Sequence, residues 1–313
     1  MILCCGEALI DMIPEPTVSG ASGFVPHCGG AVFNTAIALG RLGATAGLLS
    51  GLSQDMFGQQ LTTALTQSGV DTAHVIYSAR PTTLAFVQLT DGQARYTFMD
   101  ENSAGRMLTP SDLPALQPEV SALYFGGISL ACEPGADAYA ALLAKEGSDR
   151  LVMLDPNIRP GFIADATRYR DRLEGMIAQA DIVKISDEDL DWIVPGADTH
   201  PQKSRALLDL GARTVILTQG AQGATAYLRN GTEVHVPARP AQIVDTVGAG
   251  DTFNAGVLAS LSQAGWLRKD RWADITAAQM HDALTLGAQV AAITVSRAGA
   301  NPPWAHELNG SDT

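Results

Sequence analysis

Positive charge is scarce in this sequence. Its 313 residues include 20 Lys or Arg and 33 Asp or Glu, so the formal net charge is −13. That balance argues against nucleic acid or an anionic membrane as a partner. No lysine follows a glycine, which excludes a GxxxxGK[ST] phosphate loop. A phosphate site would therefore have to rely on backbone dipoles and a few arginines. The lysines are Lys145, Lys184, Lys203 and Lys269.

Cysteine and long apolar runs are scarce too. The cysteines form no CxxC pair, so we interpret them as small core residues in a reducing cytoplasm rather than as disulfides or metal ligands. No stretch reaches the roughly 18 apolar residues that a membrane-spanning helix needs. Acidic residues come too early in the chain for a signal peptide, and we expect a cytoplasmic protein. The cysteines are Cys4, Cys5, Cys28 and Cys132.

What is present is an alternation of short apolar runs with longer amphipathic ones. It predicts an α/β fold with a mostly parallel sheet and helices on both faces, whose ligands lie at the carboxyl ends of the strands. The first strand is followed by Gly6-Glu7-Ala8 and not by GxGxxG, which disfavours a Rossmann oxidoreductase. Strands are predicted over residues 2–5, 46–49, 122–125, 151–154, 182–185 and 214–217. Helices are predicted over residues 34–42, 56–68, 135–145, 168–178, 202–210, 252–264 and 277–295.

Two regions interrupt this alternation. Residues 84–89 and 94–99 are rich in alternating β formers, and Asp91-Gly92 between them is a hairpin signal. Residues 10–26 are irregular and contain three prolines. We interpret both regions as parts of a small β lid, about 10–28 and 80–105, inserted into a single domain spanning 1–313. An ordinary hairpin packed on the sheet is the alternative.

The most informative segment is Asp245-Thr246-Val247-Gly248-Ala249-Gly250-Asp251-Thr252-Phe253. Small residues at the start of a helix let a ligand approach the unpaired N–H groups and the positive end of the helix dipole, which suits a phosphate. A carboxylate beside a phosphate repels it, so Asp251 is a candidate base that takes a proton from an attacking hydroxyl. The alternative is an acid that stabilises the helix start.

Further polar residues follow predicted strands. Asp11 and Asn34, with Gly29-Gly30 between them, could hydrogen-bond a sugar, although Asn34 could equally cap a helix. Arg159 follows the strand at 151–154, where its guanidinium suits a phosphoryl group unless it belongs to a solvated turn. Acidic residues after the strand at 182–185 fit either a metal site or the first turn of a helix.

These motifs resemble those of the ribokinase/fructokinase (PfkB-type) family of carbohydrate kinases. The segment 245–253 resembles the family's second signature, and Gly29-Gly30-Ala31-Val32-Phe33-Asn34-Thr35-Ala36 resembles its first. The opening Cys5-Gly6-Glu7-Ala8-Leu9-Ile10-Asp11 is most similar to bacterial fructokinases. The resemblance implies a ribokinase-like three-layer α/β/α fold with a β lid over the sugar, and ATP, Mg²⁺ and K⁺ as cofactors.

The resemblance also implies roles for individual residues. Catalysis is assigned to Asp251, the backbone of Gly248, Ala249 and Gly250, and Arg159. Sugar binding is assigned to Asp11, Gly29, Gly30, Asn34, Arg106 and Asp251, although Arg106 could equally be structural. Nucleotide binding is assigned to Lys184, Ser186, Asp189, Thr218, Gly220, Gly223 and Ala288. Glu188 or Asp189 would hold Mg²⁺ through water, and Asp245, Val247, Thr294, Arg297 and Gly299 would surround a monovalent cation.

The expected activity is phosphorylation of fructose to fructose 6-phosphate. Other small sugars, sugar acids or nucleosides, such as 2-keto-3-deoxygluconate, ribose or adenosine, remain alternatives. So does a non-catalytic sugar sensor on the same fold, but the intact Gly248-Ala249-Gly250-Asp251 favours an enzyme. The expected partners are small molecules, and a homodimer, if one forms, would pair through the lid.

Overall fold

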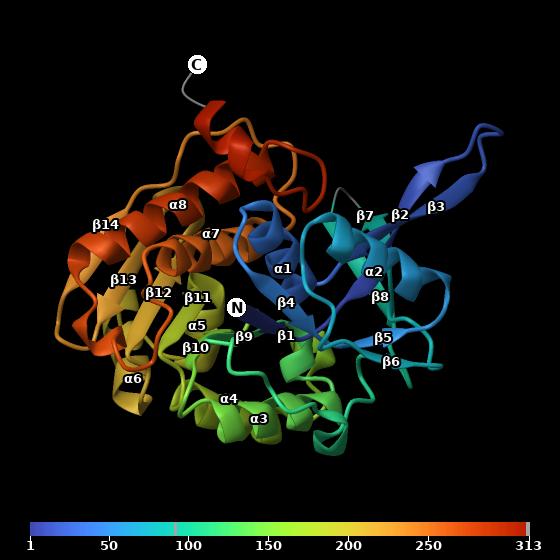
Figure 1. The fold of residues 1–313 in the computed structure, drawn as a ribbon. Helices are drawn as coiled ribbons and strands as arrows, with labels where there is room; N and C mark the ends of the chain where they lie inside the picture. The colour runs from blue at the N-terminus through green and yellow to red at the C-terminus, as the bar shows by residue number, and fades with distance from the viewer. Residues whose placement is uncertain (91–92, 311–313) are drawn as a thin grey trace.

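An eight-stranded sheet forms the centre of the computed structural model, which describes residues 1–90 and 93–310 (Figure 1). The turn predicted at Asp91-Gly92 lies outside the described residues. Neighbouring strands run parallel except at the β12–β13 and β13–β14 pairs. The strand order is β14 (Glu233–Val236), β13 (Ala224–Leu228), β12 (Thr214–Thr218), β11 (Ile182–Ser186), β10 (Leu151–Asp155), β9 (Ala122–Gly126), β1 (Ile2–Cys5) and β4 (Ala46–Leu49).

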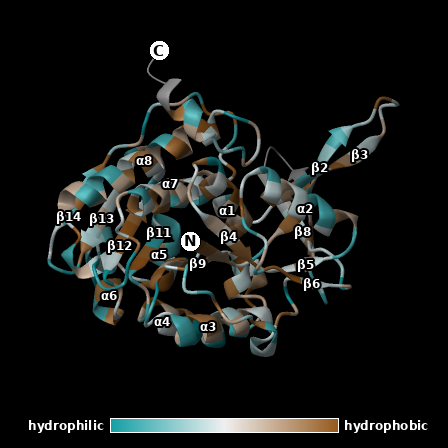
Figure 2. Cartoon of the chain, viewed as in Figure 1, coloured by the Kyte–Doolittle hydropathy of each residue, from teal (hydrophilic) through white to brown (hydrophobic). Residues whose placement is uncertain are grey.

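Helices cover both faces of this sheet, as predicted. Alternate strand residues point to opposite sides, so Met153 and Ile182 join one apolar core cluster, whereas Leu154 and Val183 join the other. The strands are coloured mainly as hydrophobic in Figure 2, and each face meets apolar helix residues. The first cluster includes α1 (Ala31–Arg41), α2 (Met56–Gln67), α7 (Ala249–Gln263) and α8 (Ala277–Val295). The second includes α3 (Gly135–Glu146), α4 (Ala166–Ile177), α5 (Asp187–Ile193) and α6 (His200–Leu210).

The predicted element positions are largely confirmed, with two informative errors. Helices α1 and α7 each begin three residues before their predicted starts, at Ala31 and Ala249. The prediction treated the glycine-rich segments as loop, because glycine is unfavourable inside helices. Gly30 and Gly248 are the N-caps instead. Asn34 is therefore inside a helix, which overturns its alternative interpretation as a cap. Helix α5 matches the alternative interpretation of the acidic residues after the strand at 182–185, and the antiparallel strands β13 and β14 are additional to the predicted elements.

A second, four-stranded sheet lies beside the main body in the order β3-β2-β7-β8. Its strands are β2 (Leu9–Pro16), β3 (Ser22–Gly29), β7 (Leu84–Thr90) and β8 (Gln93–Met99). Both regions assigned to the β lid enter this projecting sheet, and the β2–β3 arm extends away from the body in Figure 1. Phe98 of β8 packs edge-on against Phe162 at 4.4 Å between ring centroids. A short parallel pair, β5 (Gly51–Ser53) and β6 (Ile76–Ser78), completes the strands described.

The structure also bears on the membrane question. Among residues 1–90 and 93–310, no helix combines the length and hydrophobicity required to cross a membrane.

Helices α7 and α8 approach each other closely at a pair of glycines. A Cβ atom built on Gly256 would lie 2.7 Å from the Cα of Gly287 and 2.8 Å from the carbonyl oxygen of Leu286. A Cβ on Gly287 would meet the ring and carbonyl of Phe253 at 3.0 Å. These contacts fix the distance between α7 and α8, the two helices whose ends carry the predicted phosphate and cation residues.

We expect Gly256→Ala to lower the free energy of unfolding by about 1–3 kcal/mol, because the added methyl group meets backbone atoms. Gly175→Ala is the matched control, since Gly175 lies in α4 and an added Cβ there has nothing within 4 Å. That control should gain about 0.5–1 kcal/mol from reduced backbone entropy. Urea titrations of both variants measure the difference, and equal effects would contradict the close contact.

Candidate active site

The two glycine-rich motifs, far apart in sequence, meet at one carboxylate. Asp251 is the third residue of α7 and is 6% exposed. The Nδ2 of Asn34 donates a hydrogen bond to Asp251 Oδ2 at 2.9 Å, across 217 residues of sequence. From the next position on α1, Thr35 Oγ1 donates to the Asp251 carbonyl oxygen at 3.1 Å. The predicted phosphate and sugar motifs are thus adjacent.

Burial changes the proton affinity of Asp251. Loss of solvation raises its pKa from 3.8 to about 7, and the negative charge of Asp155 adds to the rise. The hydrogen bond from Asn34 and the positive charge of Lys184 act in the opposite direction. A carboxylate with this pKa can accept a proton near neutral pH, as a general base must.

Asp251 lies beside a helix start that is open to a ligand. Gly248, the N-cap of α7, has φ 77°, a left-handed conformation that favours glycine. It makes no side-chain cap hydrogen bond. The first N–H groups of a helix lack partners within it, and of those here the Ala249 N–H donates to the Thr246 carbonyl oxygen before the helix, at 3.3 Å. A Cβ on Gly250 would lie 3.1 Å from the Nζ of Lys184, so an ammonium group adjoins this backbone. We call Gly248, Ala249 and Gly250 with their N–H groups the anion cradle.

Asp11 comes from the projecting sheet. Burial raises its pKa to about 6. A Cβ on Gly29 would lie 2.1 Å from Asp11 Oδ2, so only glycine leaves room for this carboxylate. Gly30 has φ 106° and packs against the Glu7 backbone. The predicted sugar-binding residues Asp11, Gly29 and Gly30 therefore lie together, and Gly30 leads directly into the helix that carries Asn34.

Glu7 is a site-adjacent residue that the sequence analysis did not identify. Its buried carboxylate accepts hydrogen bonds from the N–H groups of Ala31 at 3.1 Å and Ser129 at 3.2 Å. Burial raises its pKa. The two bonds join the first turn of α1 to the loop after β9, which fixes the Gly30 turn. The signal that could have identified Glu7 is the position of its carboxylate, two residues after the buried strand β1.

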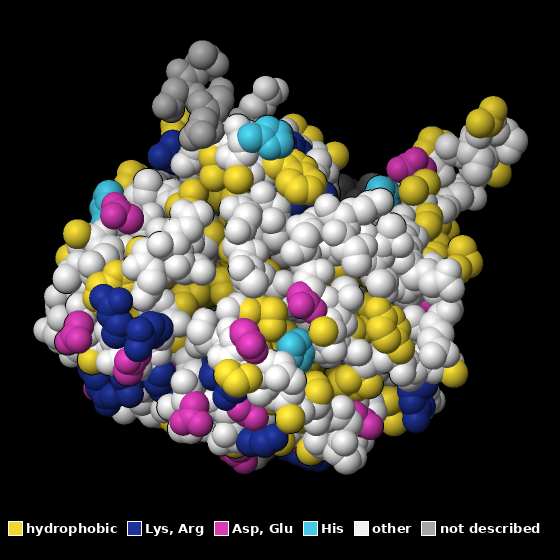
Figure 3. Space-filling model, in the orientation of Figure 1, with side chains coloured by type: hydrophobic (Ala, Val, Ile, Leu, Met, Phe, Trp, Pro, Cys, Tyr) yellow, Lys and Arg dark blue, Asp and Glu magenta, His cyan; other side chains and the backbone are white. Residues whose placement is uncertain are grey.

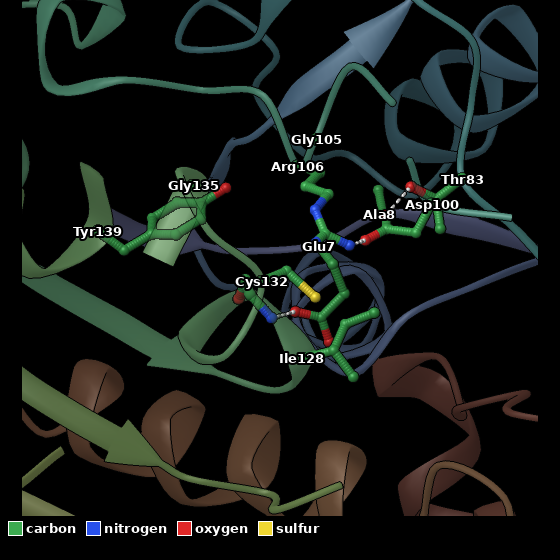
Figure 4. A pocket seen from close by; sticks show the side chains of 11 residues that line it. Glu7, Ala8, Thr83, Asp100, Gly105, Arg106, Ile128, Cys132, Gly135 and Tyr139 are labelled. Atoms are coloured by element: carbon green, nitrogen blue, oxygen red, sulfur yellow. Dashed lines mark hydrogen bonds and ion pairs between the residues drawn. The ribbon is translucent and has the colours of Figure 1, made fainter. Parts of the chain in front are cut away.

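Arg106 lies at the base of the projecting sheet, among residues lining a small cavity (Figure 4). Its Nη1 forms an ion pair with Asp100 Oδ2 at 3.0 Å, and its Nε donates to the Glu133 carbonyl oxygen at 3.1 Å. Asp100 also accepts from Thr83. These bonds favour a structural role for Arg106, and its contact with a sugar stays a prediction.

Both predicted metal residues, Glu188 and Asp189, lie in the first turn of α5, but their side chains differ in exposure. Ser186 is the N-cap of α5 and accepts a hydrogen bond from the Asp189 N–H at 3.1 Å. Asp189 Oδ1 accepts from the Ile158 N–H at 3.2 Å, and burial and then the charge of Asp155 raise the Asp189 pKa to about 6. Glu188 is exposed. The two acidic groups, Asp155 and Asp189, are suited to a hard cation such as Mg²⁺, and they favour Asp189 over Glu188.

No group of three or more His, Cys, Asp or Glu side chains within residues 1–90 and 93–310 is arranged to hold a metal ion. Asp155 Oδ1 is nevertheless buried with no hydrogen-bond partner in the described part of the chain. Such an atom fits a site that is completed by a ligand or by water.

The predicted catalytic arginine and the remaining predicted nucleotide residues lie on several separate elements. Arg159 is exposed, and its Nη1 donates only to the neighbouring Ile158 carbonyl oxygen among the described residues. Thr218 ends β12, Gly220 begins the following 3₁₀ turn, and Gly223 has φ 94° beside the backbone of β14. Ala288 is buried within α8. The Gly223 N–H donates to the Gly220 carbonyl oxygen at 3.1 Å within this turn. The common role of Thr218, Gly220, Gly223 and Ala288 in binding a nucleotide stays a prediction.

The two predicted halves of the cation site do meet. Asp245 accepts hydrogen bonds from the Val247 N–H at 3.0 Å and from the Gly299 N–H at 2.9 Å. The Asp245 N–H donates to the Val295 carbonyl oxygen at 3.2 Å. Nearby, Arg297 forms an ion pair with Glu307 at 2.6 Å, and buried Thr294 donates to the Val290 carbonyl oxygen at 2.9 Å.

Comparison with known proteins identifies the family. The model of the pfkB family carbohydrate kinases matches residues 1–307. The chain belongs to this family. It is 50% identical over 275 residues to a fructokinase of Rhizobium leguminosarum bv. trifolii, covering 88% of this chain and 84% of that protein.

Two solved structures extend the comparison. A fructokinase from Xylella fastidiosa with bound ATP has a TM-score of 0.86 and 27% identity, covering 99% of this chain and 97% of that one. A fructokinase double mutant from Vibrio cholerae O395 with fructose, ADP and potassium ion has a TM-score of 0.83 and 27% identity, covering 96% and 93%. The predicted ribokinase-like fold is confirmed, and the chain is a pfkB-family carbohydrate kinase.

The raised pKa of Asp251 predicts a pH-dependent gain in stability from Asp251→Asn. A carboxyl group whose pKa rises from 3.8 to about 7 on folding costs stability as pH increases through that interval. The amide never ionises and can still accept from Asn34. The free energies of unfolding of the variant and the wild type should agree near pH 4. Near pH 8 that of the variant should be higher by about 1–3 kcal/mol, with a correspondingly higher melting temperature. A wild-type protein that is the more stable at pH 8 would contradict a destabilised carboxylate.

Proposed function

We propose that this kinase is an ATP-dependent fructokinase that converts fructose to fructose 6-phosphate. The observation that carries the proposal is the buried Asp251 carboxylate, bonded to Asn34 and placed beside the anion cradle. Similarity to fructokinases, at 50% identity in the Rhizobium protein, supports fructose as the acceptor.

The geometry suggests how the transfer proceeds. Asp251 orients the primary hydroxyl of the sugar and accepts its proton as the oxygen–phosphorus bond forms. The bond from the γ-phosphorus to the bridging oxygen of ADP breaks, and the N–H groups of the cradle stabilise the charge on the transferring group. Arg159 adds a guanidinium from the loop after β10. Mg²⁺, held through water near Asp189, would neutralise phosphate charge when bound.

The sugar side is suited to neutral hydroxyl groups. Asn34 uses Nδ2 to bind Asp251, which leaves its Oδ1 for a sugar hydroxyl, and the Asp11 carboxylate offers further acceptors. The projecting sheet, as the proposed lid, would close over this sugar and exclude water. ATP would lie along the ends of β11 and β12, near Ser186, Thr218 and Gly223.

A coupled ADP-release assay with a panel of sugars tests this function. We expect fructose to give a higher kcat/KM than ribose, adenosine or 2-keto-3-deoxygluconate. Residues 1–40, which contain Asp11 and Asn34, include no Lys or Arg, so fructose 6-phosphate should be a poor acceptor. A higher kcat/KM for a sugar phosphate would overturn this substrate assignment, and absence of turnover with every sugar would favour the sensor.

We expect Asp251→Asn to lower kcat by about 10²–10⁴-fold with little change in the KM for fructose, because the carboxylate acts in the transition state. Steady-state kinetics with purified variant measure both constants. Asp198→Asn is a control that changes an exposed acid on the α5–α6 connection. If Asp251→Asn kept more than about a tenth of kcat, Asp251 would be a helix-start acid and not the base.

We also propose a K⁺ site between the Asp245–Val247 and Arg297–Gly299 segments, supported by the Asp245–Gly299 hydrogen bond. A cation there would fix the backbone that leads into the anion cradle. Activity should rise several-fold when KCl replaces tetramethylammonium chloride at equal ionic strength, which controls for general screening of a −13 protein. Equal rates in both salts at all ATP concentrations would remove the cation from the mechanism.

The β2–β3 arm suits a homodimer contact. Hydrophobic side chains are exposed at its tip in Figure 3, and Val18, Phe24 and Val25 of this region are exposed. We propose that a second copy covers them. Light scattering on wild type and Phe24→Asp tests the proposal, which fails if the wild-type protein is a monomer at micromolar concentration.

A further inference from the structure

Three buried polar side chains lie on one face of the central sheet, directly under α7. They are Tyr124 of β9, Asp155 of β10 and Lys184 of β11, which are 0%, 0% and 4% exposed. The parallel register pairs Met153 with Ile182, so Asp155 and Lys184, two residues further along, lie side by side. Buried charges are rare unless they are paired and have a function.

Asn254 connects these three side chains to the helix that carries Asp251. Its Nδ2 donates to Asp155 Oδ2 at 2.7 Å and to the Tyr124 hydroxyl oxygen at 3.0 Å. Lys184 Nζ donates to the same Asp155 oxygen at 3.0 Å. Asn254 is three residues after Asp251, so both lie on the same face of α7.

The side chain of Lys184 extends to the anion cradle, so its ammonium group lies next to Gly250. A Cβ on Gly250 would lie 3.1 Å from Nζ, so the ammonium group lies in close contact with this backbone. A lysine has three N–H donors, and the structure shows one bonded, to Asp155, within the described residues. The influence of Lys184 and Asp155 on the pKa of Asp251 agrees with this proximity.

We propose that Asn254 and Asp155 are positioning residues that hold Lys184 against Gly250, where its charge stabilises the transferring phosphoryl group. The Tyr124 hydroxyl oxygen accepts a hydrogen bond from Asn254 and so helps to fix the Asn254 side chain. The proposal rests on the kinase function above and extends it to residues outside the two glycine-rich motifs. In a chain with few lysines, the ion pair keeps one of them extended into the site and prevents it from turning to solvent.

A double-mutant cycle tests this dependence. Lys184→Met should lower kcat by about 10²-fold, as loss of a fixed charge-stabilising donor does. Asn254→Leu should lower kcat by about 10-fold while leaving the KM for fructose nearly unchanged. When Lys184 is already Met, adding Asn254→Leu should cost less than about 2-fold, because Asn254 acts through the lysine. Tyr124→Phe, which keeps the ring and the fold, should give a smaller loss that also disappears in the Lys184→Met background.

Binding provides a second measurement. Affinity for ADP with aluminium fluoride and fructose, a mimic of the transferring state, should fall with kcat in each variant, whereas affinity for ADP alone should not. Lys269→Met is the matched control. It breaks another buried ion pair, with Asp181 at 2.8 Å, at the opposite end of the same strands, and should lower the melting temperature without this selective loss.

Independent, multiplicative losses in the cycle would overturn the proposal, as would equal losses of ADP and fluoroaluminate binding. The cycle uses whichever sugar the wild-type enzyme turns over best, so a wrong sugar assignment does not affect it. If Asp251→Asn stayed active, the base assignment would fail while coupling between Asn254 and Lys184 remained measurable.

Discussion

Burial of the Asp251 carboxylate between α1 and α7 is the constraint around which the site is built. Removing a carboxylate from water is costly unless hydrogen bonds and nearby charge compensate for it. Asn34 supplies a hydrogen bond, and Lys184 supplies nearby positive charge. The start of α7 adds the positive end of a helix dipole. The same groups that compensate for burial of this acid also surround the space where a phosphate is proposed to bind.

The local charge at the proposed phosphate site therefore differs in sign from the net charge of the protein. The overall charge of −13 would repel a nucleotide at long range, yet the ammonium group of Lys184 lies against the backbone where phosphate is proposed to bind. The Asp155–Lys184 pair is almost fully buried, so solvent and salt screen it little. Backbone dipoles at the anion cradle supply the rest. Local arrangement outweighs net charge at short distances.

Much of the fold could be predicted because the buried parallel strands are short, continuous apolar runs, as at Ala122–Gly126 and Thr214–Thr218. Asp251 and Asn34 could be predicted because glycine next to a polar residue indicates backbone access. Asp155 and Asn254 could not, since their role depends on which face of a strand or helix they occupy and what lies opposite. Arg106 had no distinguishing pattern, and only its bonds to Asp100 and Glu133 revealed its surroundings.

Asp251, Asp155 and Lys184 lie on the central sheet and on the helix packed against it. Asp11 belongs to the projecting sheet, whose Ile10 is buried in the same apolar core cluster as the central strands and whose Phe98 packs on Phe162. The residues proposed to bind the sugar and those proposed to transfer the phosphoryl group therefore lie largely on different elements, and they can change separately in evolution. With Asp11 as a proposed sugar ligand, substitutions around it in the projecting sheet would change the proposed sugar contact and leave the proposed phosphoryl-transfer groups in place. A change of acceptor would therefore involve both the projecting sheet and α1, where Asn34 lies, while the charged core stayed fixed.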